Sequence, residues 1–154
     1  MTQASLPFAG DDAAKVTELL LYCDGGSRGN PGPSAIGAVV FDAATDPPEL
    51  IASVSECIGI TTNNIAEYRA LIAGLEAVAH LHAPVVHVRA DSMLVIKQLR
   101  GEWRVKHENL KPLHAQARKL LAAYEVADLQ HVRREENTEA DALVNQALDA
   151  AASY

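Results

Sequence analysis

The order of apolar segments along the chain restricts the possible folds more than any other feature of the sequence. Three runs with strand character come first and are joined by short connections rich in Gly and Pro. Segments with helical periodicity then alternate with two further strand-like runs. Short turns favour antiparallel pairing of successive strands, whereas strands that alternate with helices favour an α/β arrangement. The sequence therefore predicts an α/β domain with a five-stranded mixed sheet, its first three strands antiparallel, flanked by helices.

Local periodicity sets the expected limits of these segments. Apolar residues three or four apart mark the first helix, which we expect to stop before Pro84. We expect strands at residues 19–23, 35–41, 50–58, 85–90 and 126–132. We expect helices at residues 64–79, 113–124 and 138–150, with a further short helix that ends near residue 99.

Length and composition agree with one globular domain. The chain has 154 residues, of which 49% are apolar and 21% charged, and no apolar run approaches the length of a membrane span. Residues 1–16 lack the pattern of a secretory signal, so we expect a flexible lead-in followed by a single domain at 17–154. Cys23 and Cys57 fall within expected strands and suit a reducing compartment. We therefore expect a cytoplasmic monomer that has no membrane partner.

The charge is unevenly distributed along the chain. The formal net charge is −7, yet residues 97–119 contain seven Lys or Arg and only two Glu. A local basic strip suits a phosphodiester partner despite the overall negative charge. A solvated helix face is the alternative interpretation of the same residues.

Four acidic residues stand where strands are expected to end or helices to begin: Asp24, Glu67, Asp91 and Asp141. If the first and fourth strands are parallel neighbours, Asp24 and Asp91 emerge together at the carboxyl edge of the sheet. Carboxylates a few ångströms apart repel one another and raise each other's pKa, so a cluster of them needs a counter-charge. Hard oxygen ligands suit Mg²⁺ or Mn²⁺. The pattern thus indicates a divalent metal site.

Each acid also has a purely structural interpretation. Asn64 with Glu67, and Thr138 with Asp141, have the spacing of a helix capping box or a close relative of it. Asp91 can belong to the cap of the next helix, and the first acid with its following glycine is an ordinary turn signal. For any one acid alone, a capping or turn role is favoured over a metal site. The four acids occur together, each within a particular neighbouring sequence, and this favours the metal site.

Those neighbouring sequences are, in chain order, DGGSRGNPGPSAIGAVV, TTNNIAEYRALIAGLEA, ADSMLVIKQL and ENTEADALVNQA. In that order and at that spacing they resemble type 1 ribonuclease H, over residues 19–148. The resemblance implies that the domain is an endonuclease that hydrolyses the RNA strand of RNA–DNA hybrids with two Mg²⁺ or Mn²⁺ ions, leaving 5′-phosphate and 3′-hydroxyl ends. The four acids become the metal ligands. Asp24 is expected to bridge the ions, Glu67 and Asp91 to serve the water-activating ion, and Asp141 to serve the leaving-group side.

The resemblance also implies a set of substrate contacts. Small residues after the first acid would let the backbone approach the minor groove, and amide side chains can both donate to and accept from a 2′-hydroxyl. The expected substrate-binding residues are Gly25, Gly26, Ser27, Asn30, Thr62, Asn63 and Asn64. Turn and cap chemistry is the alternative for the three asparagines. Thr62 matches a position that holds a DNA phosphate.

The chain departs from the best-known family pattern in three places. The basic helix-and-loop handle of many members is replaced by GEWRVKHENLKPL. No histidine lies between His131 and Asp141, and we expect Arg134 to take the place of the missing loop histidine in catalysis. Ile60 stands where an arginine is often found near the DNA-phosphate contact.

Alternatives to this hybrid-specific ribonuclease are a non-catalytic nucleic-acid-binding module of the same fold and a nuclease domain of a larger protein with another specificity. A nucleotide P-loop is disfavoured, because GGSRGNPG lacks the Lys-Ser/Thr ending.

Overall fold

One mixed sheet in the order β4-β3-β2-β5-β6 forms the centre of the computed structural model, which describes residues 15–152. Its strands are β2 (Glu18–Ser27), β3 (Gly32–Asp42), β4 (Glu49–Thr61), β5 (Val85–Ala90) and β6 (Val126–His131). β2, β3 and β4 pair antiparallel, whereas β5 lies parallel to both β2 and β6. The α/β fold predicted from the order of the apolar segments, including its five-stranded mixed sheet, is confirmed.

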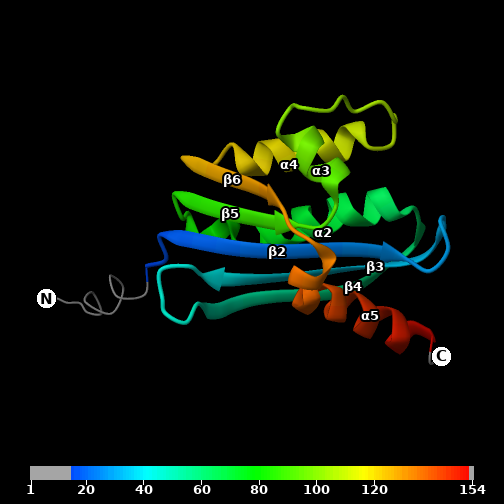
Figure 1. Cartoon of the computed structure of the whole chain (residues 1–154), viewed down its shortest axis with the longest axis horizontal. Coiled ribbons are helices and arrows are strands. Elements are labelled where there is room, and N and C mark those ends of the chain that lie inside the picture. The colour runs from blue at the N-terminus through cyan, green and yellow to red at the C-terminus, as the bar shows by residue number, and fades with distance from the viewer. Residues whose placement is uncertain (1–14, 153–154) are drawn as a thin grey trace, which may run out of the picture.

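Helices cover both faces of this sheet (Figure 1). They are α2 (Asn63–Val78), α3 (Met93–Leu99), α4 (Lys111–Leu121) and α5 (Thr138–Ala152), with single 3₁₀ turns η1 (Ala79–Leu81) and η2 (Arg134–Glu136). Alternate residues of β3 point to opposite faces. Ala38 belongs to the main core with α2, whereas Ala35 packs with Val144 and Leu148 of α5. α5 therefore lies on the opposite face from α2, and α4 packs against α2.

The main core holds α2 against β2 and β3. Leu19 and Leu21 of β2 and Val86 and Val88 of β5 are fully buried, and each pair follows the period of two expected for one face of a strand. The hydroxyl of buried Tyr68 donates to Gln98 Oε1 at 2.6 Å. This bond satisfies a polar group that would otherwise cost free energy inside the core. Packing of α2 onto β2 holds the N-terminal turns of α2 beside the carboxyl end of β2.

Several element limits differ from expectation. β2 runs on to Ser27, so Asp24 lies within the strand and does not follow its end. α4 begins at Lys111, and Pro112 therefore lies in its first turn, where the missing N–H would have no intrahelical partner in any case.

The expected lead-in falls mainly outside the described residues, and within it Val16 packs against the core. No helix among residues 15–152 combines the length and the apolar character that a membrane span requires.

Candidate active site

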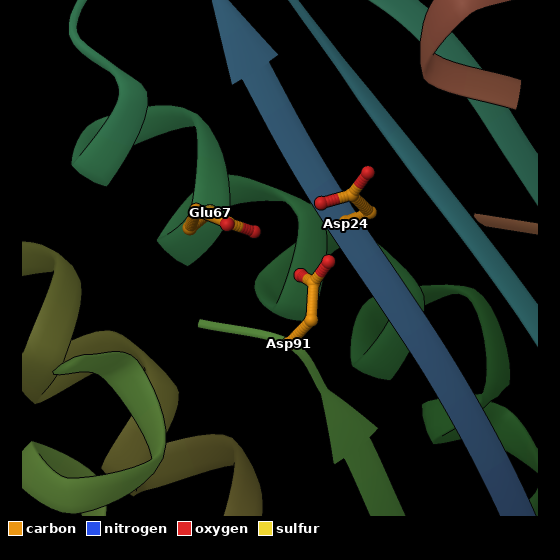
Figure 2. Close-up of side chains that lie close together, drawn as sticks. All are labelled: Asp24, Glu67 and Asp91. Carbon is orange, nitrogen blue, oxygen red and sulfur yellow. The ribbon is translucent and has the colours of Figure 1, made fainter. Parts of the chain in front are cut away.

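Three acidic side chains converge at the carboxyl edge of the sheet (Figure 2). The parallel ladder between β2 and β5 ends at the pair Cys23–Ala90. Asp24 and Asp91 are the next residues, so they lie side by side, as the sequence predicts. Glu67 reaches the same point from α2, and one carboxylate oxygen from each of the three lies within 4.8 Å of the others.

Glu67 owes its position to close contact between α2 and β2. The Thr62 side chain caps α2 by accepting from the Ile65 N–H at 3.3 Å. The N-cap is thus Thr62, and the alternative interpretation of Asn64 and Glu67 as a capping box is wrong. The Gly25 N–H donates to Glu67 Oε1 at 2.9 Å, and a Cβ at Gly25 would lie 2.2 Å from the carbonyl carbon of Ala66. The missing side chain of Gly25 therefore serves helix packing, a role that the sequence does not indicate.

Burial and mutual repulsion raise the pKa values of two of these carboxyl groups, those of Asp24 and Glu67. Asp24 is 7% exposed and Glu67 is 8% exposed. Burial, followed by the charges of Glu67 and Asp91, raises the pKa of Asp24 to about 9. Burial raises the pKa of Glu67 to about 8, against the opposing hydrogen bond from Gly25. Asp91 Oδ1 is buried without a hydrogen-bond partner. An orphaned carboxylate oxygen within a crowded acidic cluster fits a divalent cation.

Asp141 lies beside this group and is not one of its three members. It projects from the first turn of α5, and its charge also raises the pKa of Asp24. α5 comes this close because Gly37, the partner of Asp24 in β3, has no Cβ, and one placed there would lie 2.4 Å from the Ala140 carbonyl oxygen. All four acids therefore lie at one site: Asp24, Glu67 and Asp91 form a close cluster, and Asp141 lies beside it.

A cavity of about 610 Å³ surrounds the acids. Ser27 and Asn63 line it, together with both glycines that follow Asp24. Asn30, Thr62 and Asn64 are not part of its lining. The Ser27 N–H donates to Asn63 Oδ1 at 3.3 Å, and the Asn63 N–H donates to Asn30 Oδ1 at 3.0 Å. These bonds connect the glycine-rich loop to the start of α2, so Asn30 and Asn63 have the loop chemistry that is the alternative interpretation of these residues.

Basic side chains line the same cavity. His131 lies in the last strand, as expected, as the final residue of β6, and belongs to the lining. Arg134 lies in η2 with its Nη2 3.5 Å from Asp141 Oδ1, and its side chain is 78% exposed. Arg28 and Arg133 complete this basic part of the lining.

Asn137 is a structural support of the site that the sequence analysis does not identify. It is buried, and its Nδ2 donates to the Cys23 carbonyl oxygen at 2.8 Å. Its own backbone carbonyl accepts from the Asp141 N–H at 3.1 Å. Asn137 therefore joins the start of α5 to β2 next to Asp24. An asparagine directly before a helix is the available signal, but the spacing of Thr138 and Asp141 points to Thr138 as the cap.

Five of the seven Lys and Arg residues in the basic strip 97–119 fall into two groups. Three members form ion pairs with nearby glutamates: Lys97 and Arg100 with Glu102, and Lys111 with Glu108. Arg104 and Lys106 instead line a hollow of about 420 Å³ together with Trp103, which is 46% exposed. Two cations and an exposed aromatic ring thus share one surface in the segment that replaces the handle.

Comparison with known proteins places this geometry in a family. A family model described as reverse transcriptase-like matches residues 22–147. A bifunctional protein of Mycobacterium tuberculosis is 46% identical over 135 residues, which are 88% of this chain and 36% of that protein. Ribonuclease HI of Halobacterium salinarum is 45% identical over 128 residues, covering 83% of this chain and 63% of that protein. The chain thus spans about a third of the length of the mycobacterial protein and slightly less than two thirds of the length of the halobacterial one.

Solved structures of ribonuclease H proteins are similar to this chain over most of its length. The N-terminal ribonuclease H domain of the mycobacterial protein superimposes with a TM-score of 0.84 at 45% identity, over 89% of this chain and 97% of that one. LC11 ribonuclease H1, solved in complex with an RNA/DNA hybrid, gives 0.79 at 38% identity, over 86% of this chain and 98% of that one. With these matches and the acids at the sheet edge, the chain belongs to the type 1 ribonuclease H family.

Proposed function

We propose that this chain hydrolyses the RNA strand of RNA–DNA hybrids endonucleolytically, with two divalent cations, leaving 5′-phosphate and 3′-hydroxyl ends. The convergence of Asp24, Glu67 and Asp91, with a buried Asp91 oxygen that has no protein partner, is the observation that carries the proposal. The solved complex of LC11 ribonuclease H1 with an RNA/DNA hybrid supports the substrate class. Residues 17–154 would form one catalytic domain, acting as a cytoplasmic monomer.

The acids would hold the cations, and Mg²⁺ or Mn²⁺ suits their hard oxygen atoms. Bound cations would neutralise the carboxylates, acidify a water molecule and stabilise charge at the scissile phosphate. The charges of Asp91 and Asp141 both raise the pKa of Asp24, so Asp24 lies near both of these acids. Asp24 would therefore be the carboxylate best placed to bind both ions. The Gly25 N–H fixes one oxygen of Glu67 and leaves the other for a cation or a water molecule.

Arg134 would act after cleavage. Its guanidinium lies next to Asp141 and is largely exposed, so it can move from that carboxylate to a phosphate. Replacement by alanine should slow steady-state turnover more than a single turnover, because product would leave more slowly. Equal rates in both assays for Arg134→Ala and wild type would remove this residue from the mechanism.

The proposal is tested with end-labelled RNA–DNA hybrid, RNA duplex and DNA duplex of one sequence, with and without Mg²⁺. Cleavage of the hybrid's RNA strand, dependent on the metal, is expected. Asp24→Asn should lose at least about a thousandfold in kcat, as expected for an essential metal ligand. Glu56→Gln, which removes one exposed carboxylate from β4, is the matched control and should keep wild-type activity. Cleavage of the DNA duplex, or activity retained by Asp24→Asn, would contradict the proposal.

A further inference from the structure

Arg28 is a cation at the active-site cavity that the mechanism above does not use. It directly follows β2 and lines the cavity that holds the acids. Its N–H donates to the Pro33 carbonyl oxygen at 2.8 Å, and the preceding Ser27 N–H donates to Asn63. The backbone that carries the arginine is therefore held in place, and the side chain starts from a defined point beside the site.

The guanidinium of Arg28 is occupied by a carboxylate of α5. Its Nη2 lies 2.7 Å from Asp149 Oδ1, and the two side chains are 45% and 71% exposed. An ion pair this exposed contributes little to stability. A guanidinium binds carboxylate and phosphate oxygens with similar geometry. A phosphate of an incoming nucleic acid can therefore replace Asp149 at little cost.

The location of the pair suits a phosphate near the reacting bond. Asp141, Asn145 and Asp149 are four residues apart and so share one face of α5. Eight residues of helix place Asp149 roughly 12 Å from Asp141 along the axis. Asn145 lines the cavity between them, and Val144 and Leu148 of the same helix add an apolar wall. The cavity thus extends along α5 from the acids toward Arg28.

We propose that Arg28 binds a backbone phosphate of the nucleic acid one or two nucleotides from the bond that is cut, and that Asp149 holds its guanidinium in position until that phosphate arrives. This inference rests on the proposed function, because it assumes a phosphodiester substrate in the cavity. It assigns Arg28 to substrate binding and Asp149 to positioning.

Substitutions at Arg28 and Asp149 should change the affinity for the hybrid in opposite directions. Arg28→Ala should raise the KM for the hybrid about tenfold with kcat within about twofold, since a contact away from the reacting atoms binds substrate and transition state alike. The slope of log Kd against log salt should fall by roughly 0.7–0.9. Arg28→Lys should recover part of the affinity, because lysine keeps the positive charge but lacks the paired N–H donors of the planar guanidinium. Asp149→Asn should bind the hybrid about two- to fivefold more tightly, because it removes a competing anion.

Binding is measured by fluorescence anisotropy of a labelled hybrid in EDTA, and KM and kcat are measured in Mg²⁺, with thermal melts to verify folding. Arg69→Ala is the matched control, because it removes an exposed arginine of α2 that is outside the cavity lining. Two results would overturn the inference: Arg28→Ala behaves like Arg69→Ala, or Asp149→Asn weakens binding as Arg28→Ala does. If the wild type binds the hybrid without cleaving it, the proposed function fails, while the binding comparison still decides the role of Arg28.

Discussion

Replacing Asp24 by asparagine should stabilise the metal-free protein while it abolishes activity. The raised pKa of Asp24, about 9, means that the folded state keeps a proton that the unfolded chain releases near pH 4. Stability from this group is therefore complete below the unfolded pKa and is lost as pH rises toward 9. Asparagine has no ionisation to suppress, so the advantage of the variant should grow over that same pH range.

The size of the effect follows from the pKa shift. Each pH unit between the two pKa values costs the wild type about 1.4 kcal/mol, so the roughly three units from pH 4 to pH 7 set a ceiling of about 4 kcal/mol. Part of this cost comes from repulsion by Glu67 and Asp91, whose side chains can move away when Asp24 ionises. We therefore expect the variant to gain about 2 kcal/mol in the free energy of unfolding at pH 7. For a chain of this length that is a rise in Tm of roughly 4–8 °C.

The assay is urea or thermal unfolding from pH 5 to pH 9, in EDTA and in saturating Mg²⁺. In EDTA Asp24→Asn should be the more stable protein above about pH 5, and the gap should widen with pH. In Mg²⁺ the order should reverse, because only the wild type gains free energy from binding the metal at this carboxylate. Glu56→Gln should follow the wild type in both buffers. A variant that is less stable than wild type in EDTA at every pH would refute the electrostatic reasoning.

Three further outcomes follow from other parts of the structure. Arg104 and Lys106 line the hollow beside Trp103, and Lys111 pairs with Glu108; neutralising all three together should raise the KM for the hybrid with little change in kcat. The slope of log Kd against log salt should fall by roughly 0.7–0.9 for each phosphate that is no longer bound, and an unchanged slope would identify a solvated face. Asn137→Ala should destabilise the protein by about 1–3 kcal/mol and lower kcat more than it raises KM, because the first turn of α5, which carries Asp141, loses its side-chain bond to β2. Hydrogen bonds that the His87 ring donates to the carboxylates of Asp128 and Glu18 raise the pKa of His87. The stability lost in His87→Gln, measured by urea unfolding, should therefore be largest below about pH 6.5 and should shrink as pH rises through the raised pKa.

The sequence alone determined the strand content of the sheet and three of the converging acids. Local periodicity separates strands from helices, and the topology then follows from connection lengths. Since β2 and β5 are parallel neighbours, their carboxyl ends must meet, and the sequence therefore predicts Asp24 beside Asp91. Glu67 follows from its place near the start of the first helix.

Contacts between residues far apart in the chain were decided only by the tertiary structure. The Gly25–Glu67 bond, the link from Asn137 to β2 and the Arg28–Asp149 pair each join segments separated by 42, 114 and 121 residues. Local patterns carry no information about such distances, because they depend on how closely helices pack onto the sheet. For the same reason, local spacing favours Thr138 over Asn137 as the residue that supports the start of α5, and local periodicity ends β2 before Asp24. Pairing with β3 continues β2 to Ser27, although its pairing with β5 stops one residue before the acid.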